Sequence, residues 1–174
     1  PLYSSAASDV YKRQTEGVFG LGCNPNNSDA VNRILDIKNR DIAMGLIVIV
    51  SDLEQINKWV KLSATDVRAI IDGPKNTTWL VEKTDHTPYW ISGKHSSLAI
   101  RLTHHPIARE LCIQSKTALI STSANASGES PPRNTIILRR NFRGIVDYIV
   151  PGECFKNTPA STIKILKTGK ILRP

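Results

Sequence analysis

The pattern of hydrophobic and polar positions divides the chain into alternating helical and strand-like segments. Between residues 27 and 38 the apolar positions recur at the i, i+3, i+4 spacing of one helix face, and Asn27 or Ser28 is suited to cap the start. We therefore expect a helix that ends near Lys38. Residues 45–50 are continuously apolar after Gly45, which is typical of a buried strand. The helix face consists of Val31, Ile34, Leu35 and Lys38.

The same reasoning predicts the remaining elements. Pro106 suits the first position of a helix, and His105 is placed to cap it. Leu98 and Ile100 share one face of a predicted strand, and Arg101 lies on the opposite face. Because helices and strands interleave, we predict an α/β fold with a mixed sheet. The expected helices are 52–62, 64–71, 106–115 and 134–142, and the expected strands are 77–82, 97–102, 117–121, 144–150, 161–166 and 170–172.

The first fourteen residues differ in character from the rest. They contain no hydrophobic period, and residues 9–14 resemble the translation of a transposon-end adapter used in sequencing libraries. We interpret residues 1–14 as a non-native segment and residues 15–174 as one domain. The glycine-rich stretch 15–23 is then expected to form a loop whose backbone can approach a ligand closely.

Composition restricts the class of protein. With 174 residues, 40% of them hydrophobic, the chain suffices for one domain with a sizeable core. No apolar run approaches the roughly 20 residues that span a bilayer, and no secretory signal is visible, so we expect a cytoplasmic protein without a membrane partner. Cys23, Cys112 and Cys154 lie far apart, which argues against a disulfide framework and against a cysteine zinc site.

The chain is basic, with a net charge of +8. An excess of Lys and Arg favours polyanionic ligands such as nucleotides, pyrophosphate or RNA. The charges are scattered along the sequence, however, and a basic surface that keeps the protein in solution is the simpler explanation of net charge alone.

A run of small polar residues follows the apolar stretch 118–120. Ser121, Ser123 and Asn125 have the i, i+2, i+4 spacing that places side chains on one side of an extended segment. Two hydroxyls and an amide could line one wall of a site for phosphate oxygens or a ribose. They would lie at the carboxyl end of a strand, where open α/β sheets bind ligands. A polar turn explains the same residues equally well.

Three cations occupy positions that suit anionic groups. Lys38 and Arg40 could hold a triphosphate, one as a point charge and the other as a fork. The preference of helix C-termini for cations is the stronger explanation for that pair. Arg101, on the polar face of its strand, needs an anion if it is buried, which could be a substrate carboxylate or a structural Asp or Glu.

Several kinds of site are excluded or open. There is no Walker-type phosphate loop and no Gly-x-Ser-x-Gly elbow, which argues against a P-loop ATPase and a serine hydrolase. Adjacent His104 and His105 lack chelating spacing, so no metal site is assigned. No side chain is assigned as catalytic. Ser161, Thr162 and Arg173 fit an anionic pocket and a solvated edge equally well.

Taken in order, these segments resemble the YrdC/TsaC family of L-threonylcarbamoyladenylate synthases, over residues 15–174. The Ser-Thr-Ser-Ala-Asn segment is identical to the family's, and the others are similar to its motifs. The segments that carry the resemblance are Thr15-Glu16-Gly17-Val18-Phe19-Gly20-Leu21-Gly22, Lys38-Asn39-Arg40, Ala99-Ile100-Arg101, His105-Pro106, Ser121-Thr122-Ser123-Ala124-Asn125, Ala160-Ser161-Thr162-Ile163 and Arg173-Pro174.

The resemblance implies a reaction in which ATP, L-threonine and bicarbonate give threonylcarbamoyl-AMP and pyrophosphate, with Mg²⁺ accompanying ATP. It implies that a separate tRNA-modifying transferase complex uses the product at adenosine 37 of tRNA. The implied fold is a twisted open mixed sheet with flanking helices and a concave basic cavity. The implied threonine-binding residues are Thr15, Arg101 and Ser161, and the implied ATP-binding residues are Lys38, Arg40, Ser97, Ser121, Ser123, Asn125 and Arg173.

The sequence departs from the family pattern most at its start. Gln14 stands where the family has Pro, and the family's preceding helix and strand are absent, which predicts an unpaired sheet edge beside Thr15. Ala160 also replaces a proline. One alternative function is a non-catalytic module of the same fold that binds double-stranded RNA or tRNA. Another is a carbamoyl-transfer domain of a hydrogenase-maturation protein.

Overall fold

The computed structural model describes residues 10–14, 19–125, 135–150 and 160–174. The nine strands in these ranges form one sheet in the order β7-β1-β2-β6-β3-β5-β4-β8-β9. The strands are β1 Val10–Gln14, β2 Phe19–Cys23, β3 Ile47–Val50, β4 Thr77–Glu82, β5 Ser97–Leu102, β6 Leu119–Ser123, β7 Tyr148–Ile149, β8 Thr162–Ile165 and β9 Ile171–Arg173. The helices are α1 Ser28–Lys38, α2 Ala64–Ile71, α3 Tyr89–Ser92, α4 Pro106–Gln114 and α5 Thr135–Phe142, with short 3-10 helices η1 Ile42–Met44 and η2 Leu53–Ile56.

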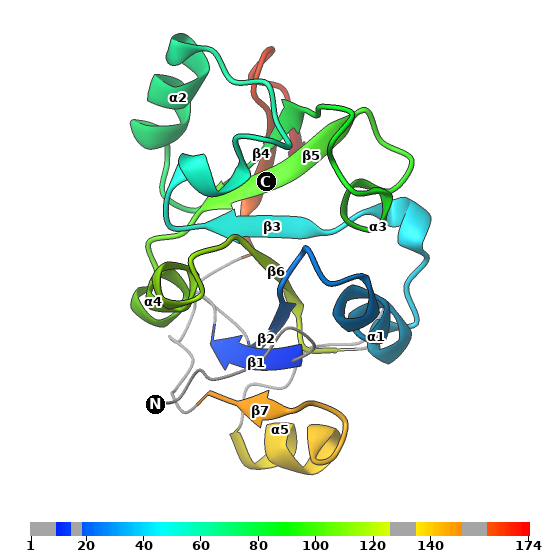
Figure 1. Ribbon diagram of the computed structural model, residues 1–174. Coiled ribbons are helices and arrows are strands. Elements are labelled where there is room, and N and C mark those ends of the chain that lie inside the picture. The colour runs from blue at the N-terminus through cyan, green and yellow to red at the C-terminus, as the bar shows by residue number, and fades with distance from the viewer. Residues whose placement is uncertain (1–9, 15–18, 126–134, 151–159) are drawn as a thin grey trace.

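Parallel and antiparallel pairings coexist in the sheet. β3 pairs with β5, β4 with β8 and β1 with β7 in parallel, and the other neighbours are antiparallel. Figure 1 shows α2 near one end of this sheet and α5 with β7 at the other. The predicted α/β fold with a mixed, open sheet and flanking helices is therefore confirmed.

The helices cover the two faces of the sheet unequally. Val48 and Val50 of β3 belong to the main apolar cluster, to which α1, α2 and α3 contribute buried side chains. The alternate residue Ile49 belongs to a second cluster, with Leu119 of β6 and residues of α4. Because successive strand side chains point to opposite faces, α4 packs on the face opposite to α1. We call the face that carries Ile49 the α4 face.

Local sequence signals set the bounds of several helices and strands. The Asn27 side chain caps α1 by accepting hydrogen bonds from the amides of Asp29 and Ala30, each at 3.0 Å. The helix ends at Asn39, which adopts a left-handed conformation with φ of 47°. Helix α2 has the predicted bounds, and a capping box between Ser63 and Asp66 fixes its start. Strands β4 and β5 also have their predicted bounds.

Other expectations were wrong where tertiary contacts override local pattern. The helix predicted over 52–62 ends at Ile56, because Val60 instead forms a bridge to Lys83 beside β4. His105 occupies the N-cap position of α4, but its side chain makes no capping hydrogen bond. The strand predicted over 144–150 contains two residues, and β6 is shifted to Leu119–Ser123 from the predicted 117–121.

The start of the described chain also differs from expectation. Phe19–Cys23 is the fully buried strand β2 rather than part of a loop. β1 pairs with β2 through five residue pairs, from Val10 opposite Cys23 to Gln14 opposite Phe19. The expectation of an unpaired sheet edge was therefore wrong, because backbone hydrogen bonds can form a strand without a hydrophobic period. The interpretation of residues 1–14 as non-native stays a prediction.

Gly93, at the end of α3, packs closely against η1. Its φ is +59°, and a Cβ atom there would lie 2.3 Å from the carbonyl oxygen of Ala43. We expect Gly93→Ala to lower the free energy of unfolding by about 3 kcal/mol, through backbone strain and a clash with backbone atoms. Gly169 is the matched control, because its φ is +67° but nothing lies within 4 Å of the added Cβ. Gly169→Ala should lower the free energy of unfolding, measured by urea denaturation, by only about 1 kcal/mol. Equal losses of stability in the two variants would contradict the close packing of Gly93 against η1.

Candidate functional site

The predicted site residues of β5 and β6 lie on one face of the sheet. Ser121 is paired with Ile47 across the sheet, and Arg101 is paired with Ile49. Paired residues point to the same face, and so do residues two apart along a strand. Since Ile49 defines the α4 face, both predicted residues and their neighbours at i±2 and i±4 point there. The residues placed on this face are Ser97, Arg101, Ser121 and Ser123.

The same face continues across β4, β8 and β9. Thr78 pairs with Ile163, and Ile163 pairs with Arg173. The antiparallel register of β4 and β5 sets Trp79 opposite Ile100, which brings Thr78 next to Arg101 on the α4 face. One continuous surface therefore carries residues from β4, β5, β6, β8 and β9.

Ser161, just before β8, is bound by its neighbours from two sides. Its Oγ lies 2.8 Å from Thr78 Oγ1, and both residues are buried. Arg173 donates from Nη2 and Nε to the Ser161 carbonyl oxygen, at 2.7 and 3.2 Å, and from Nη2 to Ser161 Oγ at 3.3 Å. We call Thr78, Ser161 and Arg173 the hydroxyl–arginine cluster.

Lys38 reaches the end of β6 from the C-terminus of α1. Its Nζ donates to the carbonyl oxygens of Ser123 and Asn125, both at 2.7 Å, and the residue is 3% exposed. Arg40 donates from Nη2 and Nε to the Gly45 carbonyl oxygen, at 2.9 and 3.2 Å. The two cations thus secure the backbone at the end of β6 and just before β3.

Both cations lie in a partly buried environment that disfavours positive charge. Burial lowers the pKa of Lys38 from 10.5 to about 8, and the nearby Arg40 charge lowers it further as the second cause. Burial also lowers the pKa of Arg40. A phosphate group beside them would offset both costs, because an opposite charge favours the protonated form. The electrostatics at this end of the sheet therefore suit an anionic ligand.

The wall predicted from Ser121, Ser123 and Asn125 is only partly formed. Ser121 and Ser123 project from β6, but Asn125 lies beyond it, and its amide donates to the Ser123 carbonyl oxygen at 3.0 Å. This turn ends the extended geometry on which the i, i+4 expectation depended. Ser121 and Ser123 lie in the carboxyl half of β6, as predicted. Because β6 is antiparallel to β3 and ends beside the start of β3, this is not a shared carboxyl edge of parallel strands.

The structure sorts the predicted residues into two groups, one on the α4 face and one near the end of β6. Arg101, Ser161 and Arg173 lie at one end, although Arg173 was predicted with the ATP-binding set. Strand spacing places Ser121 roughly 12 Å from Arg101, two strands away and two residues along. Thr15 lies outside the described residues. The second group, near the end of β6, comprises Lys38, Arg40, Ser123 and Asn125, with Ser97 at the start of β5.

Thr78 is the residue of this surface that sequence reasoning missed. A β-branched threonine within the strand 77–82 looked like an ordinary strand former. Only the pairing of β4 with β5 and β8 reveals its place between Arg101 and Ser161. The available signal was the alternation along β4, in which Thr78 falls opposite to the apolar Trp79 and Val81.

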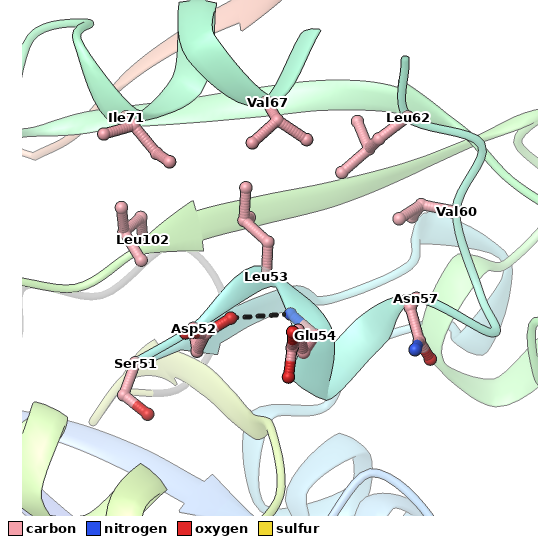
Figure 2. Close-up of a pocket in the computed structure, with 10 residues that line it drawn as sticks. All are labelled: Ser51, Asp52, Leu53, Glu54, Asn57, Val60, Leu62, Val67, Ile71 and Leu102. Carbon is pink, nitrogen blue, oxygen red and sulfur yellow. Dashed lines mark hydrogen bonds between the residues drawn. The ribbon is translucent and has the colours of Figure 1, made fainter. Parts of the chain in front are cut away.

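A hollow lies on the other face of the sheet, between α2, η2 and the end of β5. Figure 2 shows Leu53, Val67 and Ile71 pointing into it. Its volume is about 610 Å³, and the charged residues that line it are the acidic Asp52 and Glu54. It is therefore distinct from the predicted concave basic cavity, which stays a prediction.

In the part of the chain that the structure describes, no three His, Cys, Asp or Glu side chains gather closely enough to hold a metal ion. No helix in these ranges is long and apolar enough to cross a membrane.

Comparisons with known proteins give consistent results. The family model for Sua5, YciO and YrdC proteins, described as telomere recombination, matches residues 10–174. The chain is 40% identical over 161 residues to a threonylcarbamoyl-AMP synthase of Nitrosococcus oceani, covering 91% of this chain and 87% of that protein. It is 37% identical to one of Xanthomonas campestris pv. campestris, covering 97% and 92%. The crystal structure of P. abyssi Sua5 complexed with L-threonine superimposes with a TM-score of 0.85 at 27% identity, covering 96% of this chain and 50% of that chain.

Proposed function

The chain belongs to the Sua5/YciO/YrdC family, and from this membership we propose that it synthesises L-threonylcarbamoyladenylate from L-threonine, bicarbonate and ATP. Pyrophosphate is the second product. The main supporting observation is that the α4 face sets the buried Arg101 beside a cluster of hydroxyls, while the cations Lys38 and Arg40, whose pKa values are lowered by burial, lie near the end of β6. Its relatives of 37–40% identity are named threonylcarbamoyl-AMP synthases, which supports the same reaction.

In this proposal, threonine binds at the end of the face where Arg101 and Ser161 lie. Arg101 receives the carboxylate as a bidentate pair, which is the geometry that a guanidinium matches best. The solved structure of P. abyssi Sua5 with L-threonine supports an amino-acid site in this fold. Thr15 stays a predicted contributor to this end of the site.

ATP occupies the other end, near Lys38 and Arg40. Ser121, Ser123 and Asn125 supply hydroxyl and amide groups for the phosphates or ribose. The assignment of Ser97 and Arg173 to ATP stays a prediction. Arg173 contacts Ser161, which supports a role nearer to the threonine end. Mg²⁺ would accompany the nucleotide and neutralise phosphate charge, as it commonly does with substrate phosphates.

The chemistry is one of positioning and charge stabilisation. The threonine amine takes up bicarbonate with loss of water to give a carbamate, whose oxygen attacks the α-phosphorus of ATP as pyrophosphate leaves. Holding both substrates next to each other makes this attack effectively intramolecular. Lys38 and Arg40 stabilise the negative charge that develops on the departing pyrophosphate. We assign no general base.

The proposed product is the donor for the modification of adenosine 37 of tRNA by a separate threonylcarbamoyl transferase complex. That partner, a cytoplasmic location and any contact with double-stranded RNA or tRNA stay predictions. The names of the relatives support the synthase and not the RNA-binding alternative.

The proposal is tested by pyrophosphate release from ATP with bicarbonate, in the presence and absence of L-threonine. We expect release only with threonine, accompanied by threonylcarbamoyl-AMP in chromatography coupled to mass spectrometry. Omitting bicarbonate, with carbon dioxide excluded, should abolish both signals. Release that is independent of threonine, or RNA binding without any turnover of ATP, would overturn the proposal.

A further inference from the structure

Thr78 is a fully buried hydroxyl in the middle of the α4 face. Its exposed fraction is 0%, and its Oγ1 lies 2.8 Å from Ser161 Oγ. The sheet register places it between Arg101 on β5 and Ile163 on β8. It therefore touches Ser161 and adjoins Arg101, which are two of the proposed threonine-binding residues.

The hydrogen bonds around Ser161 indicate what the Thr78 hydroxyl does. A serine hydroxyl has one proton and two acceptor lone pairs. Arg173 can only donate, so its contact to Ser161 Oγ uses one lone pair. Thr78 then takes either the second lone pair or the proton. In either case the Ser161 hydroxyl has one hydrogen-bonding position left for a ligand, either its proton or a lone pair, and that position has a fixed direction.

We propose that Thr78 is a positioning residue that aims the Ser161 hydroxyl at bound L-threonine. The proposal rests on the proposed function, because it takes the α4 face as the substrate surface. Arg173 fixes the Ser161 backbone through its carbonyl oxygen and contacts Oγ at 3.3 Å, whereas Thr78 makes the shorter contact to the side chain, at 2.8 Å. Without Thr78, the hydroxyl can rotate among its staggered positions and loses its preorganisation for the substrate.

The test is the isosteric variant Thr78→Val, assayed by threonine-dependent pyrophosphate release. We expect the Michaelis constant for L-threonine to rise about tenfold, as for the loss of one buried hydrogen bond. The Michaelis constant for ATP should stay within about twofold of the wild type, because the ATP-binding group lies away from Thr78, near the end of β6. Thr78→Ser, which keeps the hydroxyl, should restore threonine affinity. Thermal melting confirms that each variant is folded.

Two controls separate positioning from a general effect on the strand. Thr77 is buried on the same strand but points to the opposite face, so Thr77→Val should leave both Michaelis constants unchanged. In a Ser161→Ala background, Thr78→Val should have no further effect on threonine affinity, because Thr78 acts through that hydroxyl.

Equal increases in the Michaelis constants for L-threonine and ATP in Thr78→Val would overturn the role of Thr78. An undiminished increase in the threonine constant when Thr78→Val is made in the Ser161→Ala background would overturn it too. An unchanged threonine constant in folded Thr78→Val would do so as well. Wild-type turnover is measured first, so loss of the proposed function is recognised separately. If the wild type shows no turnover, calorimetric titration with L-threonine alone decides the matter. A tenfold weaker binding in Thr78→Val would then support positioning, and equal or absent binding would overturn it.

Discussion

Replacing Arg101 by glutamine should raise the Michaelis constant for L-threonine by about 100-fold or more. Arg101 is 7% exposed and projects from β5 onto the α4 face, next to the hydroxyl–arginine cluster. Removing one partner of a buried, hydrogen-bonded charge pair costs about 2–5 kcal/mol, which corresponds to roughly 30- to 5,000-fold in affinity. The measurement is the initial rate of pyrophosphate release over a range of threonine concentrations at saturating ATP.

Two companion variants make the Arg101 result specific. Arg101→Lys keeps the charge but loses the bidentate fork, so its threonine constant should lie between those of the wild type and Arg101→Gln. Arg68, exposed on α2, is the matched control, and Arg68→Gln should behave as the wild type. A change of less than about threefold in folded Arg101→Gln would show that Arg101 does not bind the carboxylate, given the size of such interactions.

Replacing Lys38 by methionine should lower kcat/KM for ATP by about 100- to 1,000-fold, the range found when one preorganised electrostatic donor is removed. Methionine preserves an apolar stem of similar length but removes the charge and the two hydrogen bonds to the carbonyl oxygens of Ser123 and Asn125. The phosphates would lose a cation, and the backbone at the end of β6 would lose its anchor. Lys58→Met, at an exposed position beside η2, is the control and should retain activity.

The pKa of Lys38 predicts how activity depends on pH. Because this pKa is about 8, below the usual 10.5, Lys38 is protonated below pH 8 and loses its charge as the pH rises through that value. We expect kcat/KM for ATP to fall above about pH 8. The profile of kcat should fall at higher pH, because bound phosphate raises the pKa of Lys38 in the complex. If kcat/KM for ATP of Lys38→Met still falls over the same alkaline pH range, that fall results from another group.

Folding stability should change with pH in the opposite direction. The folded-state pKa of Lys38 lies below its unfolded value, so the folded state binds fewer protons between about pH 8 and 10.5. The cost of burying the ammonium is present below pH 8 and is relieved across this range. The wild type should therefore gain stability relative to Lys38→Met as the pH rises, although its activity falls.

The local sequence pattern was sufficient to predict helices and strands whose periodicity shows which face is buried. The spacing of Val31, Ile34 and Leu35 predicted helix α1 and its buried side, and Asn27 capped it as expected. The alternation along β5 placed Leu98 and Ile100 in the core and Arg101 on the opposite face. These features depend on periodicity and on nearby backbone groups, which the sequence displays directly.

Strand identity near the start of the chain was decided by pairing instead. β1 has no hydrophobic period, and β2 was expected to be a glycine-rich loop, yet the two pair along their length. Backbone hydrogen bonds between strands form irrespective of side-chain type. Such strands become visible only when their partners are known.

The candidate site divides in the same way. The spacing of residues along the chain was enough to identify the chemical types of the site residues, including the hydroxyls of Ser121 and Ser123 and the cations Lys38 and Arg40. Their grouping depends on the folded sheet, which sets Arg173 against Ser161, binds Lys38 to the end of β6 and places Thr78 beside Arg101. Strand order and direction result from the packing of the whole sheet, and they determine which side chains become neighbours.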